Sequence, residues 1–90
     1  MSVFASAVSM GVTNSGTIAL VLDAEFMQSK TIAPGSATVT VGARGEYTLK
    51  AGTGGTGGVN INLDAGKCDI GIETGTTILG FGATISVSIR

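Results

Sequence analysis

Histidine and tryptophan are missing from this chain of 90 residues, and cysteine, proline and tyrosine each occur once. Without histidine the chain cannot form a Ser–His–Asp triad, a Cys–His pair or a His-ligated metal site. With one cysteine it cannot form a Cys₂ or Cys₄ zinc site or an intrachain disulfide. Because no catalytic or cofactor-binding constellation remains, we expect a protein that is not an enzyme and has no cofactor.

Charged residues are also scarce, with five basic and six acidic side chains making up 12% of the chain, against about 25% in typical soluble proteins. A net charge of −1 argues against a nucleic-acid partner. The longest purely aliphatic stretch, 18–22, is far shorter than the roughly 18 residues of a membrane helix. The first residues lack the basic region of a signal peptide, so we expect cytoplasmic synthesis, with the final location open.

The abundant feature is alternation of apolar residues with polar or small ones. From 17 to 27 every even position is apolar, and the same period of two recurs along the chain, as is typical of half-buried strands. The short length and the strand spacing predict one domain over 1–90, an antiparallel β-sandwich or jelly-roll-like barrel of about seven strands. The predicted strands are 2–10, 16–27, 36–41, 46–50, 59–63, 68–73 and 77–90.

Turn residues separate these strands. Thr13–Gly16 predicts a turn, Gly42–Gly45 predicts a hairpin loop, and 28–35 predicts a longer connection that contains the proline. Gly52–Gly57 matches G-x-G-x-x-G, but a dinucleotide fingerprint needs a following helix. A strand is predicted there instead, so we interpret the segment as a hairpin loop. The alternative is a surface where a neighbouring subunit packs closely.

Three acidic residues, Asp64, Asp69 and Glu73, lie on the outer face of one predicted hairpin. Calcium binding is one hypothesis for them, and ordinary solvated charge is the favoured one. Cys68 is in phase with Ile70, which indicates a core residue, whereas an intermolecular disulfide is the alternative.

Lys30 and Arg44 are interpreted as surface cations that aid solubility, with binding of an anionic head group as the alternative. The aromatic residues are predicted to belong to the core: Phe4, Phe26, Tyr47 and Phe81.

The faces opposite the predicted core carry few charges. The first and last strands are long and rich in small residues, and as sheet edges they lack the protection that Lys, Pro or bulges give. A net charge near zero favours association. We therefore predict that these faces form an assembly interface. Its candidate residues are Gly80, Gly82, Thr84, Ser86, Ser88, Thr17, Ala19, Val21, Val3, Ala5 and Ala7.

These patterns predict a non-enzymatic structural protein that assembles with copies of itself. A virion capsid or tail component, a filament and an in-cell crystal all fit, and the sequence does not choose among them. The alternative is a small lipid- or glycan-binding β-sandwich module, which would display aromatic and polar groups at its loop tips.

Overall fold

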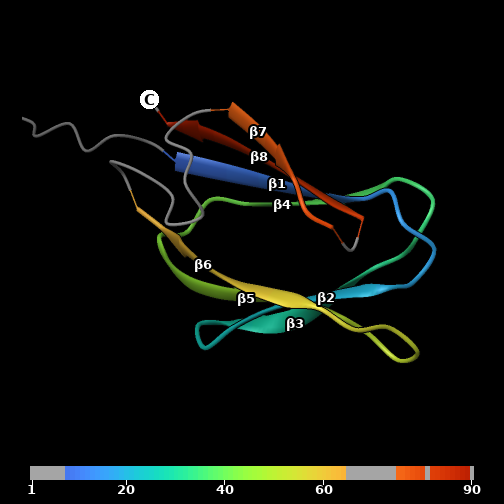
Figure 1. The fold of residues 1–90 in the computed structure, drawn as a ribbon. Helices are drawn as coiled ribbons and strands as arrows, with labels where there is room; N and C mark the ends of the chain where they lie inside the picture. The colour runs from blue at the N-terminus through green and yellow to red at the C-terminus, as the bar shows by residue number, and fades with distance from the viewer. Residues whose placement is uncertain (1–7, 65–74, 81, 90) are drawn as a thin grey trace, which may run out of the picture.

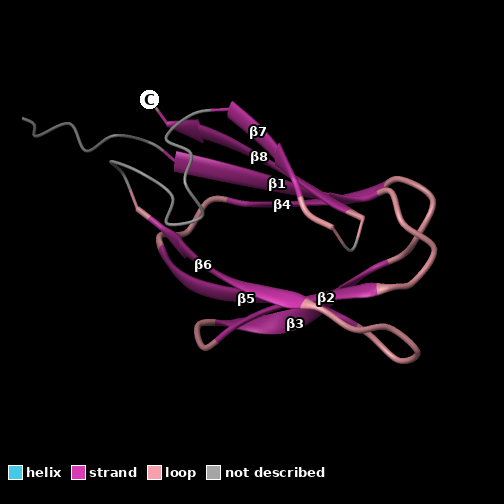
Figure 2. Ribbon diagram, in the orientation of Figure 1, coloured by secondary structure: helices cyan, strands magenta, loops and turns pink. Residues whose placement is uncertain are grey.

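The computed structural model describes residues 8–64, 75–80 and 82–89, and these ranges contain strands and turns but no helix (Figure 2). The all-β prediction is therefore confirmed for them, and they contain no helix capable of crossing a membrane. Their eight strands are β1 (Val8–Asn14), β2 (Leu20–Ala24), β3 (Met27–Ile32), β4 (Ala37–Val41), β5 (Gly45–Ala51), β6 (Gly58–Leu63), β7 (Gly75–Ile78) and β8 (Ala83–Ile89).

The strands form two four-stranded sheets that lie one above the other as two layers (Figure 1). Sheet A has the order β4-β1-β8-β7, sheet B has the order β3-β2-β5-β6, and every pairing is antiparallel. This is a sandwich-like arrangement, as expected. The barrel alternative is wrong, because no described strand of one sheet pairs with a strand of the other.

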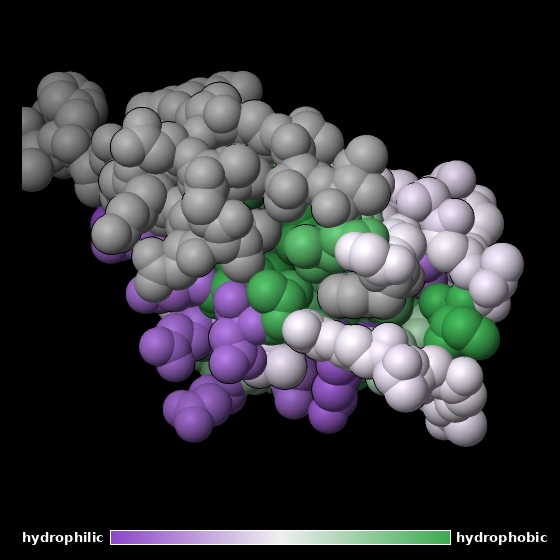
Figure 3. Space-filling view, viewed as in Figure 1, coloured by the Kyte–Doolittle hydropathy of each residue, from purple (hydrophilic) through white to green (hydrophobic). Residues whose placement is uncertain are grey.

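The core lies between the sheets and follows the predicted alternation. On β1, Val8, Met10 and Val12 are buried and the residues between them are half-buried, while β5 buries Tyr47 and Leu49 between exposed residues. Figure 3 shows apolar side chains between the two layers. Burying each such side chain contributes about 1.5–3 kcal/mol, so these rows hold the layers together.

The predicted strand 16–27 is too long, because the chain reverses direction within it. β2 ends at Ala24, Glu25 and Phe26 form a turn, and β3 runs back through most of the segment expected to be a loop. The turn contains neither glycine nor proline, so the sequence gives no stop signal. The β2–β3 register also shifts between Leu22 and Ala24, as at a β-bulge.

The predicted last strand, 77–90, is two strands joined by a tight turn. The amide of Leu79 donates to the carbonyl of Ala83 at 2.8 Å, and the amide of Gly82 donates to the carbonyl of Leu79 at 3.0 Å. Gly82 has a φ of 93°, and a Cβ there would lie 2.7 Å from the Cα of Gly16. Only glycine permits this backbone contact between segments far apart in sequence.

Three other strand predictions, 36–41, 46–50 and 59–63, are confirmed to within a residue at their ends. The first predicted strand was expected to end at residue 10 but continues to Asn14. Residues 1–7 and the predicted strand 68–73 lie outside the described residues.

β1 and β8 pair along their whole length in the middle of sheet A, from Val8↔Ile89 to Asn14↔Ala83. The expectation that the first and last strands are sheet edges is therefore wrong for β1 and β8, whereas β7, which contains residues 77 and 78 of the predicted last strand, is an edge. The edges are β4 and β7 in sheet A and β3 and β6 in sheet B. Strand order depends on pairing between distant segments, which the local alternation does not encode.

The β4–β5 loop was predicted to close a hairpin, but it carries the chain from sheet A to sheet B. Tyr47 is 1% exposed, and its hydroxyl donates a hydrogen bond to the carbonyl of Ala43 in this loop. Such a tyrosine corner anchors a crossover between sheets. Burial raises the pKa of Tyr47 above its ordinary value of 10.0.

Asn14, at the end of β1, is a fully buried polar residue. Its Nδ2 donates to the carbonyls of Ile18 at 2.8 Å and Ile32 at 2.9 Å, and its Oδ1 accepts from the amide of Gly16 at 3.0 Å. Because β1 belongs to sheet A and Ile32 to sheet B, this side chain links the two sheets. From the sequence alone, Asn14 is predicted only to be a turn residue.

Candidate functional site

The outward-facing side of β4, β1 and β8 carries only small uncharged residues, and we call it the sheet A outer face. Its residues lie between the buried positions of each strand, so alternation aims them away from the core. They are Ser9, Gly11 and Thr13 on β1, Thr38 and Thr40 on β4, and Thr84, Ser86 and Ser88 on β8.

Strand register aligns these residues in rows across the sheet. Thr13 lies opposite Thr38 on one side and Thr84 on the other, and Gly11 lies between Thr40 and Ser86. The hydroxyls of Thr13 and Thr38 are hydrogen-bonded at 2.7 Å. The face therefore presents hydroxyl groups and backbone without a charged side chain among its described residues.

The structure divides the predicted interface residues among four places. Thr84, Ser86 and Ser88 lie on the sheet A outer face, whereas Val21 lies on the outer side of sheet B. The others occupy loops or lie outside the description. Thr17 and Ala19 are in the β1–β2 loop, Gly80 and Gly82 are in the β7–β8 turn, and Val3, Ala5 and Ala7 lie outside the described residues.

β1 and β4 also contribute to this face, and their residues are not among the predicted interface residues. Alternation already placed Thr38 and Thr40 opposite Val39, but nothing in the sequence showed that β4 lies beside β1. The close approach at Gly82 is made by Gly16 of the same chain, so this glycine has an intramolecular explanation.

The outer side of sheet B has a different chemistry, and Figure 3 shows hydrophilic colouring gathered along this side of the molecule. Asp23, Glu46 and Lys50 project from β2 and β5 beside Thr48. The Asn60 side chain on β6 accepts a hydrogen bond from the Thr48 hydroxyl at 3.4 Å.

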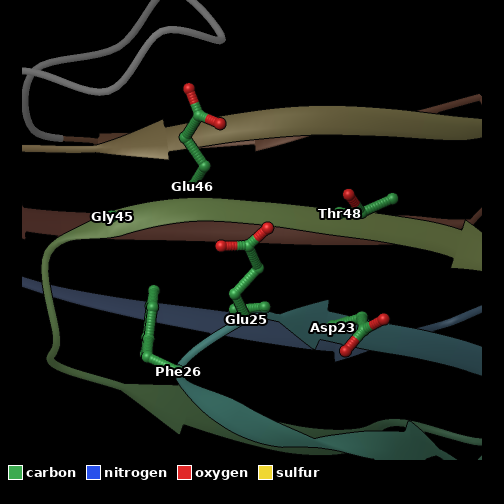
Figure 4. A pocket seen from close by; sticks show the side chains of 7 residues that line it. Asp23, Glu25, Phe26, Gly45, Glu46 and Thr48 are labelled. Carbon is green, nitrogen blue, oxygen red and sulfur yellow. The ribbon is translucent and has the colours of Figure 1, made fainter.

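An open pocket of ≈ 480 Å³ lies at one end of sheet B, where the β2–β3 turn meets the start of β5. In Figure 4 the carboxylates of Asp23, Glu25 and Glu46 lie on the same side of the strands, with Thr48 near Asp23. Asp23 Oδ1 accepts a hydrogen bond from the Ser29 hydroxyl at 2.9 Å. These oxygen atoms can accept hydrogen bonds from hydroxyl or amine groups of a ligand.

Phe26 forms one end of this pocket and is 50% exposed, so its predicted place in the core is wrong. It is located on the turn, where its ring packs edge-on against Tyr47, with centroids 5.2 Å apart and an interplanar angle of 85°. The ring also covers Gly45, where a Cβ would lie 2.6 Å from a Phe26 ring carbon. Phe26 thus shields Tyr47 with one side and exposes the other.

The remaining sequence candidates do not form a site in the described residues. Lys30 is exposed on β3, Arg44 is exposed in the β4–β5 loop, and Asp64 is exposed after β6. No group of three or more potential metal-ligating residues of the His, Cys, Asp and Glu types occurs in the described ranges. Cys68, Asp69, Glu73, Phe4 and Phe81 lie outside them.

The glycine-rich segment joins β5 to β6 as an antiparallel hairpin, as expected. The amide of Ala51 donates to the carbonyl of Gly57 at 3.0 Å, which closes the loop. A strand follows the loop rather than the helix that a dinucleotide fingerprint requires. Gly52 also donates to the carbonyl of Ala19 at 2.8 Å, so this loop packs against the β1–β2 loop.

Comparisons of the chain with protein-family models, with curated proteins and with solved structures found no match.

Proposed function

We propose that this protein is a non-enzymatic structural subunit that assembles with copies of itself, and that the sheet A outer face is an assembly contact. The observation that carries the proposal is the absence of charge on this face over β4, β1 and β8. A capsid or tail component, a filament and an in-cell crystal are the settings that fit such a subunit.

The physical argument rests on what close packing of two sheets requires. Ser, Thr and Gly have short side chains, so a second layer can approach the backbone without large cavities. A buried charge without a partner costs several kcal/mol, and this face contains none. Its hydroxyls can form hydrogen bonds with the corresponding groups of a neighbouring copy.

The experiment compares the assembly of variants that add a charge to opposite sides of the molecule. Thr84→Lys and Ser86→Glu place charges on the sheet A outer face, and the matched control Thr48→Lys places one on the charged side of sheet B. We expect the control to assemble like the wild type and the two face variants to remain as folded protomers. Size-exclusion chromatography with negative-stain microscopy measures the outcome.

Two results would refute this proposal. One is a wild-type protein that remains monomeric at high concentration. The other is normal particles or filaments from both face variants, which would show that this face is ordinary solvent-exposed surface.

The exposed ring of Phe26 favours a second candidate function, a glycan-binding module. The ring lies in a pocket with Asp23, Glu25 and Glu46, and sugars offer both apolar faces and hydroxyl groups to such a site. Because Phe26 contacts the only tyrosine in the chain, Tyr47 fluorescence reports on the pocket. A saturable change with soluble oligosaccharides, lost in Phe26→Ala, would support this candidate, and no change across neutral and amino sugars would refute it.

A further inference from the structure

The four edge strands differ in how they are protected against pairing with another chain. β3 exposes Gln28, Ser29 and Lys30 and lies beside the register shift in β2. β7 has four residues and is the shortest described strand. β6 has six residues without a charge or a register shift, and its exposed side chain is the polar Asn60. Charges, bulges and shortness are the usual means of blocking an edge.

The β4 edge, like the β6 edge, carries neither a charge nor a bulge, and it differs from β6 in its run of β-branched residues. Its sequence from Ala37 to Val41 contains no charge, proline or glycine, and four of its residues are consecutive β-branched residues, Thr38, Val39, Thr40 and Val41. It pairs with β1 on one side, and no described residue pairs with its other side. Ala37 and Val39 face inward but stay half-buried at this edge.

We infer that β4 pairs antiparallel with β4 of a second copy, around a two-fold axis through Val39. A two-fold contact uses the same patch on both partners, so the patch must be complementary to itself. The sequence Thr38-Val39-Thr40 reads the same in both directions. Antiparallel pairing around Val39 therefore places Val39 opposite itself and Thr38 opposite Thr40, and pairs of β-branched residues stabilise antiparallel strands.

This pairing joins two copies of sheet A into one sheet with β4 at its centre. Thr38 and Thr40 of both copies then extend the hydroxyl rows of the sheet A outer face, and the inward Val39 side chains cover each other. The inference rests on the proposed function, since the joined outer faces form the larger uncharged surface that packs in the assembly. A pair of five-residue strands is a small contact, so cross-linking tests it more sensitively than chromatography.

The first experiment forms a disulfide across the proposed axis. Val39→Cys is made in a Cys68→Ser background, and the protein is oxidised mildly. Directly opposite residues in antiparallel strands have Cα atoms about 4.5–5.5 Å apart, within the range that a disulfide spans. We expect about tenfold more dimer than from Thr31→Cys on the β3 edge in the same background, because pairing raises the effective concentration of the thiols.

The register is tested with two further variants in the same background. The pairing places Ala37 opposite Val41 of the second copy, so a mixture of Ala37→Cys and Val41→Cys proteins is expected to give the mixed disulfide. Each protein alone places its two thiols about four residues apart along the strands, or about 13 Å. Homodimers from either variant in place of the mixed disulfide would overturn the register.

Charge provides a second test of the edge. Val39→Lys places two like charges opposite each other at the axis, and Thr31→Lys on β3 is its control. We expect Val39→Lys to abolish assembly while Thr31→Lys retains it, with a cooperative unfolding transition showing that each protomer folds. If Val39→Lys does not fold, the disulfide experiment decides.

The outcomes separate this inference from the proposed function. If Val39→Cys gives no more disulfide-linked dimer than Thr31→Cys does, the β4 pairing is overturned, even when the wild type forms particles. Strong cross-linking at Val39 without particles or filaments supports the β4 pairing and overturns the proposed array.

Discussion

The outer sides of the two sheets carry different residues, although their inner sides are alike. Both sheets contribute fully buried aliphatic side chains to the core, among them Ile85 from sheet A and Leu49 from sheet B. The described charged residues all lie on sheet B or in loops that lead to or from it, and they are Asp23, Glu25, Lys30, Arg44, Glu46, Lys50 and Asp64. The four strands of sheet A therefore contain no charged residue.

The difference shows that a low overall charge can be distributed unevenly, with charged residues on the outer side of one sheet and none on the outer side of the other. Folding requires only that the inner faces be apolar, and both sheets meet that requirement. A solvated outer face tolerates charges, as the outer side of sheet B shows with Glu46 and Lys50. The uncharged outer face of sheet A thus calls for an explanation beyond the folding of the protomer, and assembly is the one we propose.

The largest expected effect tests whether the inner faces are equivalent. Ile85→Ala in sheet A and Leu49→Ala in sheet B each remove a side chain that is 0% exposed, and each is expected to lower the free energy of unfolding by about 2–5 kcal/mol. Urea denaturation measures both. If one substitution lowered the free energy of unfolding by less than about 1 kcal/mol, its sheet would pack more loosely in the core than the other sheet does.

A smaller effect is expected at the link between the sheets. Asn14→Ala leaves the carbonyls of Ile18 and Ile32 without their side-chain donor, and we expect a loss of about 1–3 kcal/mol in unfolding free energy. The control is Asn60→Ala on the outer side of sheet B, which is expected to change stability by less than about 0.5 kcal/mol. Equal effects in denaturant titrations would contradict the role of Asn14.

Tyr47 provides a pH test that is specific to sheet B. Because burial raises its pKa above 10.0, the folded state holds the phenolic proton more tightly than the unfolded chain does. This contribution to stability is complete below about pH 10 and is lost as the pH rises through the folded-state pKa.

The measurement uses the only tyrosine in a chain without tryptophan. Phenolate absorbance should rise at higher pH in the folded protein than in denaturant. Tyr47→Phe should remove this pH dependence and lower stability at neutral pH by about 1 kcal/mol, through loss of the hydrogen bond to Ala43. Identical titration in both states would show that the phenol is solvated.

The smallest expected effect concerns the outer faces of isolated protomers. At concentrations where the protein is monomeric, Thr84→Lys and Thr48→Lys should each change the free energy of unfolding by less than about 0.5 kcal/mol. The two faces then differ only in assembly. If Thr84→Lys destabilised the dilute protomer by more than about 1 kcal/mol, its effect on assembly would reflect folding rather than contact between copies.

Much of the inside–outside pattern was predictable from the sequence. β4, β5 and β6 lie close to their predicted positions, because strict alternation bounded by turn residues leaves little freedom for a strand. The β2–β3 turn was not predictable in this way. Glu25 and Phe26 are not typical turn residues, and the even positions stay apolar up to Phe26, which lies in the reversal itself.

The candidate site was predictable only in part. Alternation placed Thr84, Ser86 and Ser88 on an outer face, and the structure confirms that they share one. The same reasoning grouped them with Val21, which lies on the opposite sheet. Alternation also predicted that Phe26 belongs to the core. That prediction is wrong because the ring lies on the β2–β3 turn, where it covers Tyr47 and remains half exposed.

The sequence by itself determined that the chain forms strands, which side of most strands is buried, and that charge is scarce. These properties depend on side chains that are neighbours along one strand. Only the tertiary structure decided that β1 and β8 lie side by side, that β4 and β5 belong to different sheets, and that the small outward residues of three strands share one face. Strands pair through backbone groups that are nearly the same in every residue, so the choice of partner emerges only when the whole core is packed.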